Sequence, residues 1–496
     1  MAAKRYLAID LGAESGRAMV GSLENGTLSV EELHRFSNGP IRILDTLYWD
    51  LPFIYSNVVE SLRLYAQKHG ASVDGIGIDS WAVDHGLLDK DGDLLMNPVC
   101  YRDKRTEGMV EEIDEVCSVR EMFERSGIPI VPIYTAVQLF ALMRKKPHVL
   151  DMAEQLLLMP DLLNYLLCGS RLTERSNAIT TQLYDPRTRT WSEEVFGKLG
   201  LPRRIMTDLV DPGARLGELR PALKEETGLE RAPIIAPCTH DTGSAMAAVP
   251  ASNENYAAVS CGTWSIVAMN SDKAHTSDEA YRANLCNELT LGGLFLCRNI
   301  MGLWLLQQTR AAWEKAGRAY SYDELDGMAQ NAAAHGPLLN VNDGAFLAPK
   351  RMPDAITEFC QRTGQEAPAS EGAMVRCIFE SLALSYREAI EHIQPLVGRA
   401  VETVHIVGGG CRNTLLCQMT ANAMQRPVVA GPADATAAGN LLTQAMGDGA
   451  IHSAQEVRDV VRNSVEVSRY EPEEADYWIQ RFERYREIEA RTRAAV

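Results

Sequence analysis

Three short motifs in the sequence combine residue types that can bind and transfer phosphate. The first, Asp10-Leu-Gly-Ala-Glu-Ser-Gly-Arg17, brings a carboxylate, two glycines, a hydroxyl and a guanidinium together in one segment. Glycine lets backbone N–H groups approach phosphate oxygens closely, serine donates a hydrogen bond, and arginine offsets negative charge. The motif predicts a hairpin that cradles phosphate, although a purely structural hairpin can have the same composition.

The second motif, His240-Asp241-Thr242-Gly243, follows the apolar run 234–236. If this run is a strand, Asp241 projects from the strand's end. A carboxylate there can take the proton from an attacking hydroxyl or help to position a metal-bound phosphate. An aspartate at this place is also a common helix N-cap, so the residues alone leave both roles open. His240 is expected to be a packed polar residue.

The third motif is the run of three glycines within 407–413, directly after the strand-like segment 404–406. Consecutive glycines disfavour both helix and strand, so their presence here requires an explanation. One explanation is that the flat base of a nucleotide lies against backbone that carries no side chains. The alternative is a flexible turn. Two familiar nucleotide motifs are missing, because the chain has no G-x-x-x-x-G-K-[ST] loop and 75–80 lacks the third glycine of a dinucleotide fingerprint.

The elements that must position these motifs repeat within the chain. Residues 6–20 align without gaps with residues 256–270, and residues 233–245 resemble residues 427–439. The first pair predicts a strand, a tight turn and a second strand, twice. The second pair predicts a buried strand, a turn and the start of a helix, also twice. Glycine turns after strands recur by chance in α/β proteins, but two echoes in the same order predict two similar halves.

Helical stretches at 56–69 and 372–391 alternate with short apolar runs at 76–79 and 404–407, which favours layered α/β halves. Two segments rich in turn residues, 129–135 and 184–190, are expected to be loops or insertions.

The boundary between the halves is expected in the polar segment 250–255. We therefore predict one domain over 1–249 and a second over 250–496. Near the C-terminus, Trp478, Phe482 and Tyr485 occur at helical spacing within a charged segment, which predicts a packed amphipathic helix.

Composition excludes several classes of partner. The chain has 496 residues, of which 46% are hydrophobic and 23% charged, as in ordinary globular proteins of two or three domains. Its 49 basic and 66 acidic residues give a formal charge of -17, which repels nucleic acid and anionic membrane surfaces. Without an apolar leader or a run of about 18 apolar residues, the sequence predicts a soluble cytoplasmic protein.

The 11 cysteines are scattered, and no C-x-x-C spacing occurs. This pattern argues against a zinc site or a thioredoxin-like centre. In a reducing cytosol such residues behave mostly as small buried hydrophobes, although Cys360 with Cys377, or Cys411 with Cys417, could pair if geometry and compartment allowed.

Taken together, the motifs resemble those of the FGGY carbohydrate kinases, members of the actin-like ATPase superfold. Segment 10–17 is similar to the family's first phosphate motif, 261–263 to the second, and 407–413 to the adenosine motif. Further similar segments extend the resemblance from residue 6 to about residue 472: 77–84, 101–106, 236–242, 260–265, 299–307 and 405–416. The resemblance implies an α/β, ribonuclease H-like fold of two similar lobes with a central interlobe cleft.

The resemblance also implies that ATP and Mg²⁺ take part and that Asp241 is the proton acceptor. The residues that it implies for contact with ATP are Ala13, Glu14, Ser15, Gly16, Arg17, Thr263, Gln307, Gly409 and Asn413. Those that it implies for contact with the sugar are Ala82, Asp84, His240, Asp241, Thr242 and Asn299. Asp10 and Asp241 would face the Mg²⁺ shell.

Within the family, the motifs most resemble those of members that act on L-rhamnulose, which implies phosphorylation at O1 to L-rhamnulose 1-phosphate. The family pattern has glycine in place of Ala82 and an aromatic residue in place of His85, so another ketose, such as L-fuculose or a xylulose, is the alternative. An actin-like ATPase without a sugar substrate and a catalytically idle sugar sensor are further alternatives. Intact Asp10 and Asp241 argue against the sensor. The sequence does not predict the oligomeric state.

Overall fold

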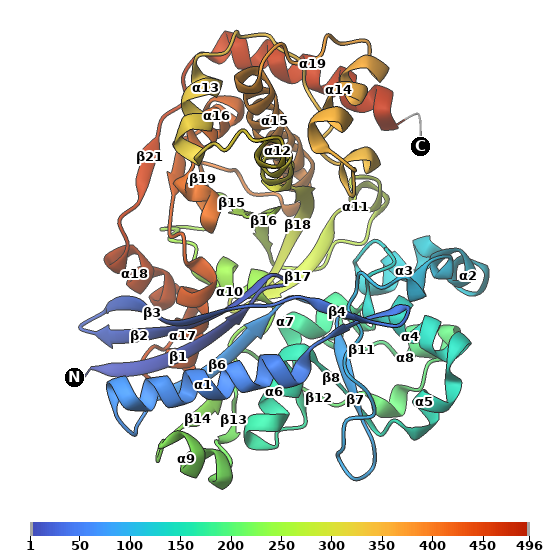
Figure 1. Ribbon diagram of the computed structural model, residues 1–496, viewed down its shortest axis with the longest axis vertical. Coiled ribbons are helices and arrows are strands. Elements are labelled where there is room, and N and C mark those ends of the chain that lie inside the picture. The colour runs from blue at the N-terminus through green and yellow to red at the C-terminus, as the bar shows by residue number, and fades with distance from the viewer. Residues whose placement is uncertain (1–2, 494–496) are drawn as a thin grey trace. The chain divides into compact units, whose positions relative to one another are not determined.

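The computed structural model describes residues 3–493 (Figure 1). By its internal contacts the chain forms two compact units, which we describe separately. Unit 1 contains the chain up to Ser252 together with Ser271–Leu296 and Ala435–Ser464. Unit 2 contains Asn253–Asn270, Cys297–Asp434 and the chain from Val465 onward.

Unit 1 is built on a six-stranded sheet in the order β13-β14-β6-β1-β2-β3. Strand β1 pairs antiparallel with β2 and parallel with β6, and β6 pairs parallel with β14. All residues of β6 are buried, as expected for a parallel strand covered on both faces. The strands of this sheet are β1 (Lys4–Leu11), β2 (Ser15–Glu24), β3 (Thr27–Ser37), β6 (Gly75–Ser80), β13 (Arg215–Glu218) and β14 (Pro233–Ile235).

Helices α1 (Leu51–His69), α10 (Asp241–Ala247) and α17 (Ala435–Gly447) pack around this sheet. Asp50 caps α1 by accepting a hydrogen bond from the backbone N–H of Phe53. Helices α10 and α17 touch backbone to backbone, since a Cβ on Gly439 would lie 1.8 Å from the carbonyl oxygen of Ser244. Helix α17 also reaches the sheet, because Gln444 Nε2 donates to the carbonyl oxygen of Leu7 at 3.1 Å.

The other elements of unit 1 are short and lie mainly between α1 and β13, with α11, β17 and α18 contributed from later in the chain. They are β4 (Pro40–Ile43), β5 (Thr46–Trp49), β7 (His85–Leu88), η1 (Lys104–Thr106), α2 (Met109–Val116), α3 (Val119–Ser126), α4 (Thr135–Lys145), α5 (Pro147–Met152), β8 (Gln155–Leu158), α6 (Met159–Cys168), β9 (Leu172–Glu174), α7 (Arg175–Ala178), η2 (Ile179–Thr181), β10 (Tyr184–Asp185), β11 (Thr190–Trp191), α8 (Glu193–Leu199), η3 (Arg203–Ile205), β12 (Asp208–Val210), α9 (Pro221–Thr227), α11 (Asp278–Arg282), β17 (Cys286–Thr290) and α18 (Ala454–Ser464).

Unit 2 contains strands of a second sheet, which follow the order β18-β16-β15-β19-β20-β21. Strand β15 pairs antiparallel with β16 and parallel with β19. The elements are β15 (Tyr256–Cys261), β16 (Trp264–Ser271), β18 (Gly293–Met301), α12 (Trp304–Lys315), α13 (Tyr322–Gln330), η4 (Gly344–Phe346), α14 (Met352–Arg362), α15 (Glu371–Val397), β19 (Thr403–Val407), η5 (Gly409–Arg412), α16 (Thr414–Met424), β20 (Val428–Ala430), β21 (Ser468–Tyr470) and α19 (Ala475–Arg493).

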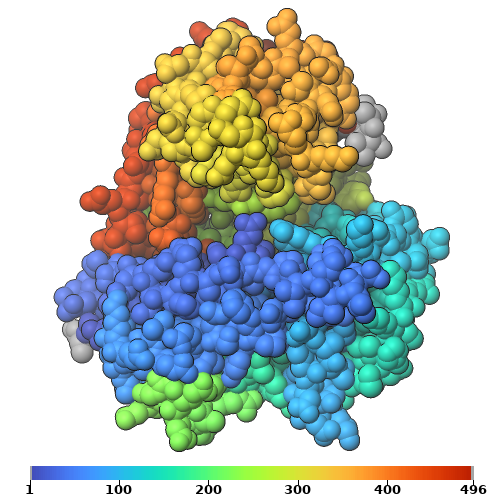
Figure 2. All heavy atoms as spheres, viewed as in Figure 1, coloured from blue at the N-terminus to red at the C-terminus, as the bar shows by residue number. Residues whose placement is uncertain are grey.

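Figure 2 shows one face of the molecule. The N-terminal segment, in blue, forms much of the visible surface of unit 1, and the segments of α12 to α14, in yellow to orange, form much of that of unit 2. Within residues 3–493, no helix is both long enough and apolar enough to cross a bilayer.

Both echoes predicted from the sequence are confirmed as structure. The first corresponds to the antiparallel hairpins β1-β2 and β15-β16, and the second to β14 followed by α10 and β20 followed by α17. The expected helices and strands fall within α1, α15, β6 and β19. Trp478, Phe482 and Tyr485 are all buried on α19, which confirms a packed amphipathic helix.

One segment differs from the prediction. Residues 184–190, expected to be a loop, begin a small hairpin in which Tyr184 pairs with Trp191. Both aromatic side chains are buried, and their rings meet edge to face, so local packing stabilises two short strands around a turn that the sequence did indicate. Segment 129–134 is a loop, and Thr135 begins α4.

Candidate functional site

Three carboxylates gather at the carboxyl ends of the central strands of unit 1. Asp10 on β1 and Asp79 on β6 are partners in the parallel register, so their side chains point to the same face of the sheet. Asp79 is fully buried and accepts a hydrogen bond from Asn440 Nδ2 of α17. Burial and then the charge of Asp10 raise the pKa of Asp79 well above its usual value, and Asp241 raises it further.

The turn between β1 and β2 is held in one shape by its own backbone. The N–H of Gly12 donates to the carbonyl oxygen of Ser15 at 2.9 Å, and Asn38 donates to the carbonyls of both Gly12 and Glu14. Asp10 Oδ2 accepts a hydrogen bond from Arg17 Nη2 at 2.6 Å, so the first and last charged residues of the motif form an ion pair.

Glycine is required at position 16 for packing. A Cβ there would lie 2.2 Å from the ring of Phe36. Gly16 is buried, whereas Ala13 and Ser15 are partly exposed and Glu14 is exposed. The tip of the turn is therefore the part of the motif that a ligand can reach.

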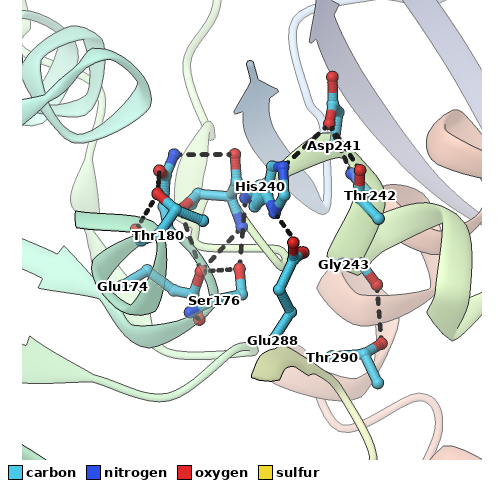
Figure 3. Close-up of polar contacts among 11 residues, drawn as sticks. Glu174, Ser176, Thr180, His240, Asp241, Thr242, Gly243, Glu288 and Thr290 are labelled. Atoms are coloured by element: carbon cyan, nitrogen blue, oxygen red, sulfur yellow. Dashed lines mark hydrogen bonds and ion pairs between the residues drawn. The ribbon is translucent and has the colours of Figure 1, made fainter. Parts of the chain in front are cut away.

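Asp241 is the first residue of α10, and the N-cap position belongs to His240. The N-cap role that the sequence left open for Asp241 is therefore not the one it has. Its Oδ1 accepts hydrogen bonds from the backbone N–H of Thr242 at 2.6 Å and from Thr242 Oγ1 at 3.3 Å. The second carboxylate oxygen points away from the residues labelled in Figure 3.

The environment of Asp241 favours a proton acceptor. Its side chain keeps 34% of its exposure. Burial raises the pKa of Asp241, His240 lowers it and Asp10 raises it, and the net direction is upward. A raised pKa makes this carboxylate a stronger base than an exposed aspartate.

His240 lies between two carboxylates. Its Nε2 is 3.5 Å from Asp241 Oδ1, and its Nδ1 is 3.2 Å from Glu288 Oε2 on β17. Burial lowers the pKa of His240, but Glu288 and then Asp241 raise it, and the net direction is upward. The sequence expectation of a packed polar residue agrees with this burial but did not include the ion pair.

The backbone that precedes Asp241 is held by a further buried carboxylate, that of Glu174. Glu174 accepts hydrogen bonds from the N–H of Thr239 at 2.8 Å and from its Oγ1 at 2.9 Å. It also accepts from the N–H and the hydroxyl of Ser176, and Ser176 Oγ accepts from the N–H of His240 at 3.2 Å. Sequence reasoning missed Glu174, Ser176 and Glu288, because no local pattern links them to a motif so distant in the chain.

Both carboxylate oxygens of Asp84 accept hydrogen bonds from groups of the protein itself. Its Oδ2 accepts hydrogen bonds from Trp49 Nε1 at 2.6 Å, from Trp81 Nε1 at 3.1 Å and from the N–H of Tyr101 at 3.1 Å. Its Oδ1 accepts from Gln138 Nε2 at 2.9 Å. Burial raises the pKa of Asp84 to about 6, although these hydrogen bonds oppose that rise. The side chain fixes the shape of the loop that carries it.

The two residues that depart from the family pattern flank Val83 and Asp84. Ala82 is partly exposed, and Val83 after it has a left-handed φ of 71°. A β-branched residue in that conformation is strained, which is common at ligand sites. His85 is buried, and burial together with Arg105 lowers its pKa to about 3, so the ring is neutral.

In unit 2, the turn between β15 and β16 meets the start of α12. The hydroxyl of Thr263 donates to Gln307 Oε1 at 3.2 Å, and the N–H of Leu303 donates to the carbonyl oxygen of Gly262 at 2.9 Å. Two residues implied for ATP contact are therefore side by side. Asn299 lies on β18 of the same unit.

The glycine triplet starts a 3₁₀ turn, η5, in which Gly408 is the N-cap and Gly409 and Gly410 are the first two residues. Gly408 has a left-handed φ of 79°, and a Cβ on Gly410 would lie 2.2 Å from Cys261 Sγ. Gly409 is exposed, and a Cβ on it would meet no atom within 4 Å. Backbone geometry thus explains two of the glycines, whereas Gly409 offers open backbone. Asn413 caps α16 through its Oδ1 and donates from Nδ2 to Asp326 at 2.9 Å.

The side chains fit the binding of a hard divalent cation together with phosphate. In the described part of the chain, no group of three His, Cys, Asp or Glu residues is arranged to hold a metal. Mg²⁺ in kinases is usually held by one or two carboxylates plus phosphate oxygens, so such a group is not needed. Asp10 and Asp241 supply carboxylate oxygens of this kind.

The chain matches two family models. Residues 5–248 match the model described as the N-terminal domain of the FGGY family of carbohydrate kinases, and residues 257–447 match the model of its C-terminal domain. A rhamnulokinase of Bacteroides thetaiotaomicron is 40% identical over 476 residues, which cover 96% of this chain and 97% of that protein. A rhamnulokinase of Bacillus subtilis is 34% identical over 472 residues, covering 95% and 96%.

Solved structures share the fold at low sequence identity. A ligand-bound xylulose kinase from Lactobacillus acidophilus superposes with a TM-score of 0.81 at 17% identity, covering 99% of each chain. A glycerol kinase from Plasmodium falciparum with ADP gives a TM-score of 0.75 at 14% identity, covering 99% of this chain and 98% of that one.

Proposed function

Because the chain belongs to the FGGY family of carbohydrate kinases, we propose that it transfers the γ-phosphoryl group of ATP to O1 of L-rhamnulose, giving L-rhamnulose 1-phosphate. The choice of sugar is supported by rhamnulokinases that are 34% to 40% identical over almost the whole chain. The observation that carries the proposed mechanism is the carboxylate of Asp241. One of its oxygens is held by Thr242, and its pKa is raised.

Asp241 acts as the base in this mechanism. Phosphoryl transfer requires little covalent chemistry from a protein, so positioning and charge stabilisation supply most of the rate gain. Asp241 accepts the proton of the attacking hydroxyl, and Thr242 keeps the carboxylate in a fixed orientation. Asp10 and Asp241 would hold Mg²⁺, which when bound neutralises charge on the β- and γ-phosphate oxygens.

The remaining residues bind and orient the substrates. The residues proposed for ATP are the turn Ala13, Glu14, Ser15, Gly16 and Arg17 in unit 1 and Thr263, Gln307, Gly409 and Asn413 in unit 2. His240, Thr242, Ala82 and Asn299 contact the sugar. Asp84 shapes the sugar loop indirectly, since four protein donors already occupy its oxygens.

In this proposal 1–249 carries the base and all of the proposed sugar contacts except Asn299, and 250–496 carries adenosine. We place the reaction in the cytoplasm, because the cysteines are thiols rather than disulfides, as in a reducing compartment. Another ketose is the alternative substrate, because Ala82, where the family pattern has glycine, is partly exposed on the proposed sugar loop.

Replacement of the base tests the proposal. Asp241→Asn is expected to abolish ADP release with L-rhamnulose while nucleotide affinity, measured by calorimetry, stays near wild type. Asp151→Asn, on the exposed surface of α5, is the matched control and should keep full activity. More than a tenth of the wild-type rate in Asp241→Asn would show that another group is the base.

A panel of L-rhamnulose, L-fuculose and xyluloses in the same assay identifies the sugar. ADP release that no ketose stimulates would contradict the kinase proposal altogether.

A further inference from the structure

Strand β17 crosses α10 with two side chains directed toward it. Side chains alternate along a strand, so Asn287 faces one way and Glu288 and Thr290 face the other. Asn287 Nδ2 donates to the carbonyl oxygens of Gly127 and His275, both at 2.8 Å, which fixes the strand from behind. Thr290 Oγ1 donates to the carbonyl oxygen of Gly243 in α10 at 2.7 Å.

The approach of β17 to α10 depends on the glycine of the His240-Asp241-Thr242-Gly243 motif. A Cβ on Gly243 would lie 2.7 Å from the carbonyl oxygen of Leu289 and 3.3 Å from Cβ of Ser176. The bare Cα therefore lets β17 pass in direct contact with the first turn of the helix. This contact brings the side chain of Glu288 to the ring of His240, one turn before Gly243.

Glu288 and His240 form a buried pair. The side chain of Glu288 is 8% exposed and that of His240 is 9% exposed. Within the described residues, His240 is the one basic group that forms an ion pair with Glu288. The N–H of His240 is fixed separately by Ser176 Oγ, and its Nε2 faces Asp241 (Figure 3). The backbone and one ring nitrogen are thus held by the protein, and the other ring nitrogen is presented to the base.

We propose that Glu288 is a positioning residue for the phosphoryl transfer, which holds the imidazole of His240 so that its Nε2 edge faces Asp241 and the sugar hydroxyl. The inference rests on the proposed function. A carboxylate beside one ring nitrogen, as Glu288 Oε2 is beside Nδ1, sets the orientation of the ring and determines what the other nitrogen presents. Glu288 belongs to β17 rather than to any motif that the sequence singled out, so the role follows from the geometry alone.

A merely structural pair would have different consequences. Loss of a structural contact would lower the melting temperature and affect both substrates alike. Loss of a positioning contact should affect the sugar and spare ATP, because a small misplacement at the reacting centre can cost about 10²-fold in rate.

The test compares Glu288→Ala with Glu288→Gln. We expect Glu288→Ala to lower kcat/KM for the sugar by about 10- to 100-fold, with KM for ATP within about twofold of wild type. Glu288→Gln should recover part of that loss, because its amide oxygen can occupy the place of Oε2, 3.2 Å from Nδ1. Glu225→Ala, exposed on α9, is the matched control and should behave as wild type. If Glu288→Ala lowered kcat/KM by the same factor for the sugar and for ATP, the proposal would be overturned.

A double variant tests whether Glu288 acts through His240. If it does, Glu288→Ala should cost nothing further in a His240→Gln background. If the fold losses in kcat/KM of the two single variants multiply in the double variant, the two residues act independently and the inference is overturned. The ¹⁵N shifts of the His240 ring, measured in the full chain, should change in Glu288→Ala and stay unchanged in Glu225→Ala. Unchanged ring shifts in Glu288→Ala would also overturn it, even if that variant were poorly active.

The outcomes separate the two proposals. If wild type phosphorylates the ketose and Asp241→Asn does not, but Glu288→Ala is normal, the positioning role fails and the proposed function stands. If wild type shows no sugar-dependent ADP release, the proposed function fails. In that case the ring shifts still report whether Glu288 orients His240.

Discussion

At the scale of single residues, the proposed chemistry depends on which groups surround Asp241. One of its oxygens is committed to Thr242, and the imidazole of His240 lies beside the same oxygen. Burial and Asp10 raise its pKa, and His240 opposes them. The residue that the sequence marked as a helix cap or a base is therefore a partly buried carboxylate within a small charged group. This environment is typical of functional sites.

The directions of these pKa shifts predict the pH profile. A base must be ionised, so kcat/KM for the sugar should fall as pH decreases through the raised pKa of Asp241. His240 lowers that pKa, so its removal in His240→Gln should raise it and move the acidic limb of the profile to higher pH. Rates measured across the acidic range in wild type and variant check this. A limb that moves to lower pH would contradict the assignment of His240 as the stabilising neighbour.

At the scale of elements, the sequence predicted what depends on neighbours along the chain. The two hairpins and the two strand-turn-helix units follow from short apolar runs that end in glycine turns, and the structure contains all four. The glycine triplet was also correctly marked as unusual. Its full explanation required the structure, because the packing of Gly410 against Cys261 joins residues far apart in the chain.

Contacts between distant elements could not be predicted from one sequence. Glu288 reaches His240 only because β17 is seated on α10, and Glu174 reaches Thr239 only because β9 ends beside the loop before α10. Neither glutamate has a local pattern that distinguishes it from a surface residue. Asp84 shows the same limit, since its four donors come from Trp49, Trp81, Tyr101 and Gln138.

The contact between α10 and β17 gives a prediction at this scale. Gly243→Ala would bring a methyl group to 2.7 Å from the carbonyl oxygen of Leu289, so the helix and strand must separate. We expect the free energy of unfolding to fall by about 1–3 kcal/mol, as for other overpacked sites. Sugar turnover should also fall, because Glu288 moves away from His240. Urea unfolding and the ADP-release assay measure the two effects.

The matched control is Gly327→Ala in α13. A Cβ at that position meets no atom within 4 Å, and glycine in a helix interior is unfavourable relative to alanine by about 0.5–1 kcal/mol. This variant should be as stable as wild type or more so, with unchanged turnover. If Gly243→Ala were as stable as the control, the packing of β17 against α10 would not depend on the absence of a side chain at position 243.

At the scale of the whole molecule, the two compact units do not correspond to two continuous halves of the sequence. Segments Ser271–Leu296 and Ala435–Ser464 belong to unit 1 although they come late in the sequence. They contribute Glu288 and Asn440, which contact His240 and Asp79. The side chains that contact His240 and Asp79 therefore come from segments far apart in the chain. Truncation after residue 249 would remove groups that hold this site.

Labelling of the cysteines, which occur in both units, tests the fold and the proposed adenosine loop. All 11 are thiols rather than disulfides, and only Cys168 in unit 1 and Cys411 in unit 2 are partly exposed. The native protein should therefore incorporate at most two thiol labels, and the unfolded chain eleven. Burial raises the pKa of Cys411 to about 11, so its labelling should be slow at neutral pH and faster in mildly alkaline buffer.

Cys411 lies in η5, two positions beyond Gly409, so ATP bound on the glycine backbone should cover it. Cys168, at the end of α6, is the internal control. We expect ATP to slow the labelling of Cys411 at least about tenfold, as bound ligand excludes the reagent, while Cys168 reacts at an unchanged rate. Mass spectrometry of labelled peptides resolves the two sites. Protection of both thiols alike would indicate a general tightening of the protein, and protection of neither would remove the glycine triplet from the nucleotide site.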